Sequence, residues 1–244
     1  MILRASLAAI ALTVAGASAS AQVLTPDHHA CVNSQGTVEP ADQEKACSAV
    51  IKLGGAQENV AIAYSNRGNS FLRRGQNERA IQDYNQAIGL DARFADAYRN
   101  RGAAWFNLEA YDKALPDYDA AIRLDPREPG GYTDRCSVYA MTGKAAEAKA
   151  DCDKAIELDP MFVEAMAWRA LALLQLGDID AAEFDIVRAV PDQPKDPALR
   201  YVFAMVLEAK GDKKGAEEQF QVARELDAEE FARLDKLYGR FRKR

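Results

Sequence analysis

The stretch Tyr64-Ser65-Asn66-Arg67-Gly68 returns twice along the chain, at a constant interval of 34. It comes back as Tyr98-Arg99-Asn100-Arg101-Gly102 and then as Tyr132-Thr133-Asp134-Arg135-Cys136. Two series of alanines keep the same period: Ala80, Ala114, Ala148, Ala182 and Ala216, then Ala87, Ala121, Ala155, Ala189 and Ala223. Five units of this length follow one another without a gap: 61–94, 95–128, 129–162, 163–196 and 197–230.

Each unit contains two stretches of about 14 residues with helical apolar periodicity, which predicts a pair of helices. Glycines at 75, 143, 177 and 211 fall between the two stretches, where a helix can end in the positive-φ conformation. Glu109 replaces this glycine in the second unit, so we expect a slightly different turn there. No such unit buries its apolar face alone, and neighbouring units are therefore expected to stack into a solenoid.

The period and these residues resemble the tetratricopeptide repeat family over residues 61–230. The family pattern has a large residue at unit position 4, small residues at positions 8, 20 and 27, an aromatic residue at position 24 and proline at position 32. Some positions depart from it, with Cys152 and Ile186 at position 24 and Ala92 and Ala228 at position 32. The resemblance implies an all-α, right-handed solenoid of five tandem helix-turn-helix repeats.

The composition narrows the classes of function. The chain has 31 Lys and Arg against 37 Asp and Glu, and a net charge of −6 argues against non-specific nucleic-acid binding. The only histidines are His28 and His29, which removes Ser–His and Cys–His catalysis and most zinc sites from the bulk of the chain. Without a Gly-rich phosphate loop or a nucleophile elbow, the sequence predicts a non-enzyme with neither cofactor nor metal.

Residues 1–21 have the three parts of a secretory signal peptide. Arg4 supplies the positive charge, Leu7 to Val14 is apolar, and small residues lead to a cleavage site after Ala21. The apolar run is too short for a membrane anchor, and no other segment predicts a membrane span. We therefore expect an exported protein, periplasmic or secreted, with an N-terminal segment at 22–60 that holds a degenerate helix pair.

The spacing of the cysteines fits helix pairs. Cys136 and Cys152 differ by 16 in number, which places them level in an antiparallel hairpin, and export favours a disulfide over two buried thiols. Cys31 and Cys47 have the same spacing, so a similar pair is expected before the first unit. Pro40 would open its second helix, and Gly54-Gly55 would close it.

A metal site formed by His28, His29 and Cys31 is the alternative interpretation of the N-terminal cysteine. It is disfavoured because a fourth ligand is missing and because thiols of an exported chain oxidise.

A charged pattern follows the same register. Four arginines precede four aspartates by the same interval as the cysteines: Arg67 and Asp83, Arg101 and Asp117, Arg135 and Asp151, Arg169 and Asp185. A row of anion-binding arginines is conceivable, but each cation has a carboxylate at the level of its own hairpin. We predict four structural ion pairs, a use that suits the bidentate guanidinium. In the fifth unit, Phe203 and Gln219 end the series.

The family builds its concave face mainly from first-helix positions 2, 5, 6, 9, 12 and 13. In the first two units these are polar: Ser65, Asn66, Asn69, Arg73, Asp96, Arg99, Asn100 and Asn107. In the last two they are apolar or aromatic: Trp168, Leu171, Leu174, Tyr201, Val202 and Met205. Of these, we expect Asn66, Asn69, Arg73, Arg99, Asn100, Asn107, Trp168 and Tyr201 to bind a peptide, because amides grip a backbone and aromatic residues form hot spots.

The C-terminal end can limit this binding surface. A capping helix and basic tail are predicted over 229–244, and the apolar face of this helix can cover the apolar inner positions. We expect the basic residues of the tail, Arg240, Arg242, Lys243 and Arg244, to be solvated.

One family subtype clamps acidic tails with two asparagines and three basic residues. Asn69 and Asn100 match the asparagines, but Ser65, Gly130 and Asp134 replace the basic residues, so that clamp is not expected.

The sequence thus predicts a non-catalytic scaffold or adaptor of the cell envelope. Its partner would be a protein or peptide held in the concave groove, without nucleic acid. The alternative is a structural assembly factor for cell-wall or outer-membrane machinery, acting through the convex face or through self-association.

Overall fold

The computed structural model describes residues 26–32 and 37–242, and over these residues the fold is all-helical, as predicted. The expected signal peptide, residues 1–21, lies outside the described residues. Two helices come first, α1 (Pro26–Val32) and α2 (Pro40–Leu53). Pro40 begins α2 and Gly54 caps its end with φ of 71°, as the sequence predicted.

Five antiparallel helix pairs follow. They are α3 (Gln57–Arg73) with α4 (Asn77–Leu90), α5 (Ala95–Asn107) with α6 (Tyr111–Leu124), α7 (Pro129–Met141) with α8 (Ala145–Leu158), α9 (Val163–Leu176) with α10 (Ile179–Ala189), and α11 (Pro197–Lys210) with α12 (Lys213–Leu226). A last helix, α13 (Ala228–Tyr238), runs into a short 3₁₀ turn, η1 (Gly239–Phe241).

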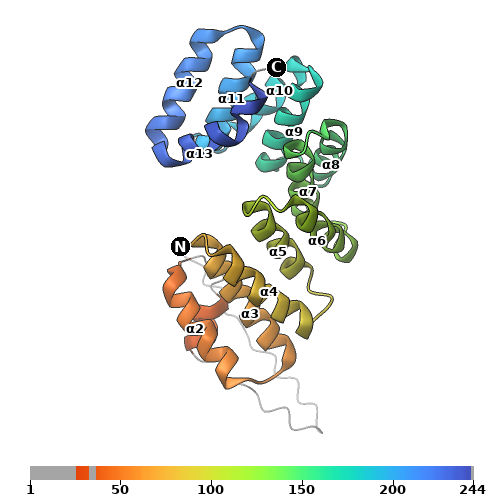
Figure 1. Cartoon of the computed structure of the whole chain (residues 1–244), viewed down its shortest axis with the longest axis vertical. Coiled ribbons are helices and arrows are strands. Elements are labelled where there is room, and N and C mark those ends of the chain that lie inside the picture. The colour runs from red at the N-terminus through yellow and green to blue at the C-terminus, as the bar shows by residue number, and fades with distance from the viewer. Residues whose placement is uncertain (1–25, 33–36, 243–244) are drawn as a thin grey trace, which may run out of the picture.

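The pairs stack in chain order along an arc (Figure 1). Each first helix also contacts the first helix of the next pair, from α3 through α5, α7 and α9 to α11. Helices α2–α4 and α11–α13 lie at the two ends of the arc, and its open side lies between them (Figure 1). This curvature makes the first helices the inner wall.

Small residues on the first helix of each of the first two pairs face large residues on the second. A Cβ added to Gly68 would lie 2.7 Å from the ring of Tyr84, and one added to Gly102 would lie 2.6 Å from the ring of Tyr118. Both contacts are shorter than real carbon contacts, so these glycines are required by the close approach of the helices. In the third pair, the two equivalent positions are Cys136 and Cys152.

Two disulfides are present. Cys31 joins Cys47 with a Cα–Cα distance of 4.6 Å, and Cys136 joins Cys152 at 5.6 Å. Cys31 is therefore unavailable to a metal ion, and the buried-thiol alternative for Cys136 and Cys152 does not apply. The second disulfide stands where the first two pairs have the glycine–tyrosine contact. In the third pair the two helices are therefore joined at this level by a covalent bond instead of by packing against a tyrosine ring.

The turn at Glu109 does not differ from the glycine turns. Glu109 has φ of 57°, close to the 68° of Gly75. The Glu109 amide donates to the carbonyl of Phe106, as the Gly75 amide donates to that of Leu72. The expectation of a different turn is therefore wrong. The Ala110 amide donates to the carbonyl of Trp105, as the Gln76 amide donates to that of Phe71, and these helix-closing bonds hold a non-glycine residue in the left-handed region, where L-residues are strained.

The four arginines lie against the four aspartates of their own pairs. In each case Nε and Nη2 donate to the two carboxylate oxygens at 2.5–2.8 Å. The remaining Nη1 reaches back to the second helix of the preceding pair. Its acceptors there are Ser48 for Arg67, Asn85 for Arg101, Asp119 for Arg135 and Asp153 for Arg169. Each arginine therefore ties its own hairpin together and also fastens it to the hairpin before.

Candidate functional site: the concave groove

The polar half of the groove contains a shallow pocket of about 410 Å³ between α3 and α5. It is lined by Ser65, Asn66, Asn69, Leu72, Arg73, Phe94, Asp96, Arg99 and Asn100. Five of the predicted site residues, Asn66, Asn69, Arg73, Arg99 and Asn100, thus come together in it; we call this the polar pocket. Ser65 itself is buried, and it contributes more to helix packing than to the surface.

The Asn69 side chain has a fixed orientation. The buried Tyr84 hydroxyl donates to Asn69 Oδ1 at 2.7 Å, and Asn100 Nδ2 donates to the same oxygen at 3.0 Å. Burial raises the pKa of Tyr84, which keeps this hydroxyl protonated and able to donate. Because Oδ1 accepts both bonds, the amide presents Nδ2, a donor, to the pocket.

Arg99 has unused hydrogen-bonding capacity. Its Nε atom is buried without a partner in the described part of the chain, and its Nη1 lies 3.8 Å from Asp134 Oδ2 of α7. Burial raises the pKa of Asp134 to about 7; Arg99 opposes the rise, and Glu128 and Glu164 add to it. Below about pH 7 Asp134 is largely protonated, and it is then a weaker partner for the Arg99 guanidinium.

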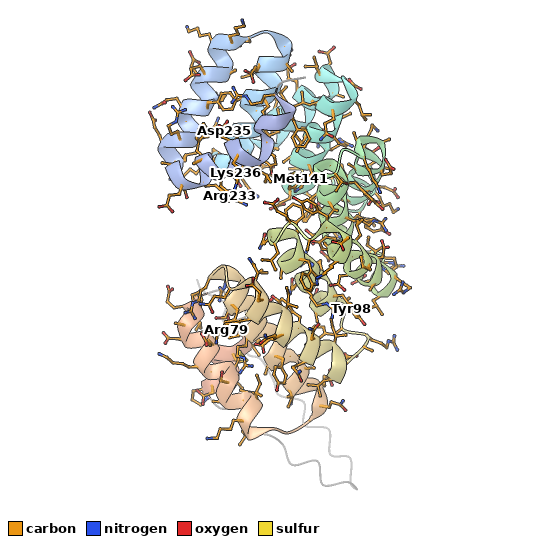
Figure 2. All side chains as sticks on the ribbon, viewed as in Figure 1. Arg79, Tyr98, Met141, Arg233, Asp235 and Lys236 are labelled. Atoms are coloured by element: carbon orange, nitrogen blue, oxygen red, sulfur yellow. A yellow bond between two sulfur atoms is a disulfide. The ribbon has the colours of Figure 1, made fainter. Side chains whose placement is uncertain are left out.

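Two other predicted residues lie at the edges. Arg73 is exposed and donates to Gln43 of α2 at 2.5 Å, so the N-terminal helix pair positions it. Asn107, at the end of α5, lies outside the polar pocket. It lines a separate cavity of about 240 Å³ together with Phe106, Glu109, Tyr111, Arg233, Lys236 and Leu237. In Figure 2, Arg233 and Lys236 lie on the part of α13 that borders the open side of the arc.

The apolar half of the groove is covered by α13. Tyr201 is fully buried, its ring centroid lies 5.5 Å from that of Phe231 and 6.0 Å from that of Tyr238, and its hydroxyl donates to Asp235 at 2.7 Å. The prediction that Tyr201 binds a partner from an open surface is therefore wrong, because the capping helix removes this aromatic surface from water. Leu171, Val202 and Met205 are buried as well.

Trp168 is only half-buried. Its ring stands edge to face between Phe106 of α5, at 6.1 Å, and Tyr238 of α13, at 6.0 Å. Helix α13 thus reaches back from the fifth unit toward the second. No pattern in the sequence signals this contact, since Phe106 and Tyr238 are far apart in the chain and belong to different units.

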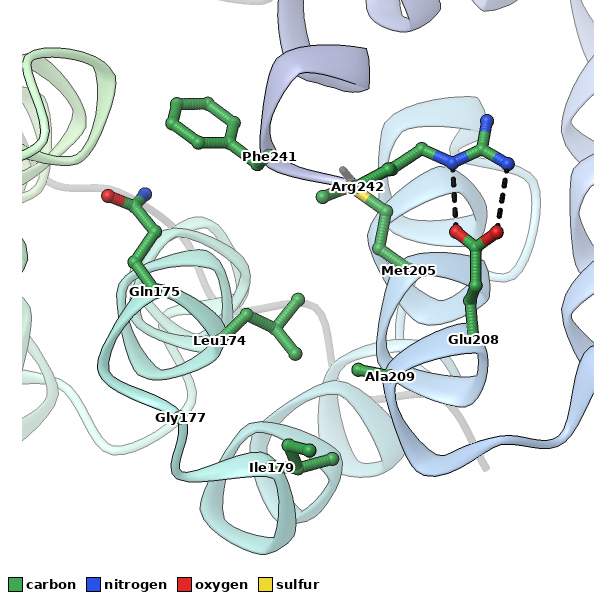
Figure 3. Close-up of a pocket in the computed structure, with 9 residues that line it drawn as sticks. All are labelled: Leu174, Gln175, Gly177, Ile179, Met205, Glu208, Ala209, Phe241 and Arg242. Carbon is green, nitrogen blue, oxygen red and sulfur yellow. Dashed lines mark hydrogen bonds and ion pairs between the residues drawn. The ribbon is translucent and has the colours of Figure 1, made fainter. Parts of the chain in front are cut away.

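Arg242 belongs to the covered half too. It forms a bidentate ion pair with Glu208, through Nε at 2.8 Å and Nη2 at 3.2 Å (Figure 3). The expectation of a solvated tail is wrong for this residue, because a carboxylate of α11 lies within reach of the turn that follows α13. Glu208 stands at position 12 of the fifth unit, one of the concave-face positions, but no pattern in the sequence pairs it with Arg242 of the tail.

Over the described residues there is no group of three or more His, Cys, Asp and Glu side chains placed to hold a metal ion. None of the helices described is both long and apolar enough to cross a membrane.

Comparisons with known proteins agree with this architecture. A family model described as "TPR repeat" matches residues 68–109, and two described as "Tetratricopeptide repeat" match residues 95–128 and 138–197. No curated protein sequence matches the chain significantly.

Among solved structures, the chain resembles YrrB, "a TPR protein with an unusual peptide-binding site", with a TM-score of 0.54 at 22% identity over 76% of this chain and 94% of that one. It also resembles a thermophilic TPR protein of Thermus thermophilus, with a TM-score of 0.63 at 18% identity over 74% and 96% of the two chains. A tetratricopeptide repeat protein from Parabacteroides merdae gives a TM-score of 0.62 at 19% identity, over 80% and 78%.

The chain therefore contains tetratricopeptide repeats, and its fold is the helical solenoid of this class. Proteins of this class are generally scaffolds for protein interactions, and nothing in the described structure suggests catalysis.

Proposed function

We propose that the protein is a non-catalytic scaffold that holds an extended segment of a partner protein in the polar pocket. The observation that carries this proposal is the pair of donor groups there: Asn69 Oδ1 is already occupied, which leaves its Nδ2 to donate, and the Arg99 guanidinium, which is one-third exposed, makes only a distant contact to Asp134. Donors of this kind match the carbonyl oxygens of an extended backbone, which carries an acceptor at every residue.

The pocket also suits a segment bound without strict sequence preference. Asp96 is exposed at its rim and can accept from backbone amides, while Leu72 and Phe94 give limited apolar contact. Recognition through backbone groups makes affinity depend on the conformation of the segment more than on its side chains. The solved relative YrrB is described as having a peptide-binding site, which is in keeping with such a role.

We further propose that the protein is exported and works in the cell envelope, periplasmic or secreted. The support is the signal-peptide pattern of residues 1–21 and the presence of two disulfides, which persist in oxidising compartments. Mass spectrometry of the protein isolated from cell fractions tests this. We expect an N-terminus immediately after Ala21 in the envelope or medium, and a cytosolic protein that retains residues 1–21 would contradict export.

The pocket is tested by site-specific photo-crosslinking in the native envelope. A photoreactive residue at Asn66, in the pocket, should capture a partner, whereas one at the exposed Gln86 of α4 should not. Arg99→Leu in the Asn66 probe should reduce capture at least fivefold. Because Arg99→Leu also removes the contact of Nη1 with Asp134, the control is Asp134→Asn, which weakens that contact but keeps the guanidinium and should leave capture unchanged. Equal capture from both positions, or capture that survives Arg99→Leu, would remove the polar pocket as the site.

A structural assembly role is the second candidate. Phe184 and Val187 of α10 are 61% and 50% exposed, and Met161 is 60% exposed. Arg188 joins them, because it lies over the Phe184 ring at 5.3 Å and donates to the carbonyl of Pro160. Light scattering of the purified protein tests self-association through this patch: an oligomer that dissociates on Phe184→Ser favours assembly over the pocket-based role.

A further inference from the structure

The apolar half of the groove holds a helix of the chain itself. We call this half the C-terminal groove; Trp168, Leu171, Tyr201 and Met205 form its floor. Helix α13 and the turn η1 place four large side chains along one face: Phe231, Leu234, Tyr238 and Phe241. Their spacing of three, four and three keeps them on a single helical stripe. This is the pattern by which helices bind grooves in other proteins.

The helix fills this groove incompletely. A cavity of about 450 Å³ lies beside Phe241 and Arg242, lined by Leu174, Ile179, Met205 and Ala209 among others (Figure 3). A second one of about 110 Å³ lies beside Tyr238, against Trp168, Leu171, Leu199 and Val202. Both hollows are open to solvent, so α13 leaves part of the apolar surface beside it without a side chain packed against it.

Apart from its apolar stripe and the hydrogen bond from the Tyr201 hydroxyl to Asp235, α13 has few attachments. Asp227 alone separates it from α12, which ends at Leu226, and the backbone there is extended. At the other end, the Arg242 and Glu208 side chains keep 29% and 38% of their surface exposed. Ion pairs this exposed contribute little to stability, so the helix is held mainly by its apolar stripe.

From these features we propose that the C-terminal groove is a second binding site, for an amphipathic helix of a partner protein, and that α13 is the internal helix which this partner displaces. The partner helix would carry large apolar or aromatic residues with the spacing of Phe231, Leu234, Tyr238 and Phe241. A bulkier residue at the last of these positions would enter the larger cavity, which gives the partner an advantage over α13. The proposal uses none of the residues of the polar pocket and therefore goes beyond the function proposed above.

The internal helix lowers the apparent affinity for any competitor. A partner binds only the fraction of molecules in which α13 has left the groove, so its apparent Kd rises by the reciprocal of that fraction. A substitution that weakens the packing of α13 in the groove, but makes no contact with the competitor, increases this fraction. If α13 occupies the groove, a competitor should therefore bind such a variant more tightly than it binds the unaltered protein.

The experiment uses the full chain and a fluorescent peptide with the sequence of residues 227–242, followed by anisotropy. In the protein, Arg242→Glu places like charges beside Glu208 and Asp235 and loosens the internal helix. The peptide keeps its own arginine for Glu208. We expect the peptide to bind this variant at least threefold more tightly than the unaltered protein. Lys214→Glu is the control, since Lys214 is 90% exposed on α12, and it should leave the Kd unchanged.

Two readouts decide the site. Peptide binding to the Arg242→Glu protein should remove hydrogen-exchange protection from residues 228–238 while α9 and α11 stay protected. A Glu208→Arg protein should prefer a peptide in which Arg242 is glutamate, because the charge pair is then restored in reverse. Binding that leaves α13 protected, no binding to Arg242→Glu, or equal affinity for both peptides would overturn the proposal. Exchange of α13 between two copies, seen as a stable dimer of the loosened variant, would assign the groove to self-association and would overturn it too.

Discussion

Arg135 holds both carboxylate oxygens of Asp151, from Nε at 2.7 Å and from Nη2 at 2.8 Å. The same guanidinium donates from Nη1 to Asp119 at 2.7 Å. One side chain thus connects α6, α7 and α8. The bidentate geometry fixes the guanidinium plane, which is why lysine could not make the three contacts in its place.

Loss of one partner in this arrangement should be costly. Asp151→Ala leaves a largely buried guanidinium with the exposed Asp119 as its remaining carboxylate, and we expect a loss of about 3 kcal/mol in the free energy of unfolding. Urea denaturation followed by circular dichroism measures it. The matched control is Glu157→Gln, which removes the surface pair with Lys154 and should change stability by less than about 0.5 kcal/mol. Similar small losses for both variants would show that the interhelical pairs are not structural.

The turn at Glu109 predicts a stabilising substitution. Glu109→Gly should raise the free energy of unfolding by about 1 kcal/mol, because glycine adopts φ near 57° without steric cost. The reverse change, Gly143→Ala at φ of 77°, should lower it by a similar amount. Thermal melts of the two variants check both signs. A destabilised Glu109→Gly protein would mean that the glutamate side chain makes a contact worth more than the backbone strain.

The second disulfide should act as a staple on the third helix pair. Replacing Cys136 and Cys152 together by alanine should cost about 3 kcal/mol, the usual value for closing a loop of this size. Both sulfur-bearing residues are fully buried, so a reductant should reach the native bond only when the pair opens. Denaturation midpoints of the double variant, compared with a Cys31 and Cys47 double variant, test this. A midpoint equal to that of the unaltered protein would contradict the prediction.

Asp134 predicts a pH dependence of stability. Its pKa is raised to about 7 in the folded protein, against an ordinary value of 3.8, so the folded state binds a proton more tightly than the unfolded chain does. The contribution of Asp134 is thus fully present below about pH 4 and is lost as the pH rises toward 7.

Asp134→Asn removes this loss. Because the Asp134 side chain keeps 31% of its surface exposed, solvent screening reduces the cost of its charge. We expect the variant to gain about 1–2 kcal/mol over the unaltered protein between pH 5 and pH 8, measured by urea denaturation across this range. Parallel stability curves for the two proteins would contradict it.

Much of the fold follows from the repeat period, since position in a unit determines which side chains meet. Gly68 and Tyr84 and, one unit later, Gly102 and Tyr118 make the same contact. The arginine–aspartate pairs could also be predicted, because an antiparallel hairpin sets the two residues level. Contacts between units were harder to predict. The hydrogen bond from Arg101 to Asn85 depends on how neighbouring hairpins stack, and the pattern inside one unit does not specify that stacking.

The groove shows the same limit. The residues of the polar pocket were predictable from their unit positions, but the use of their hydrogen bonds was not. That Asn69 Oδ1 is occupied by Tyr84 and Asn100 follows from the side-chain directions of three helices. Tyr201 was misassigned because an aromatic residue suits an interface and an interior equally well. Only the path of α13 after Asp227 decides between them, and a single extended residue sets that path.

In the second, third and fourth units, the arginine donates to an acceptor on the preceding unit, and this acceptor has the same position in successive units. Neighbouring units can therefore be exchanged without losing the hydrogen bond between them. Asn85, Asp119 and Asp153 stand at the same unit position, so an arginine of any unit meets an acceptor when one whole unit is inserted or removed upstream of it. The polar pocket lies in the first two units and the C-terminal groove in the last ones. The number of units between them therefore works as a spacer that sets how long a tether must be to join two bound segments of one partner. Since effective concentration depends steeply on that match, a gain or loss of one unit would retune avidity without altering a single binding residue.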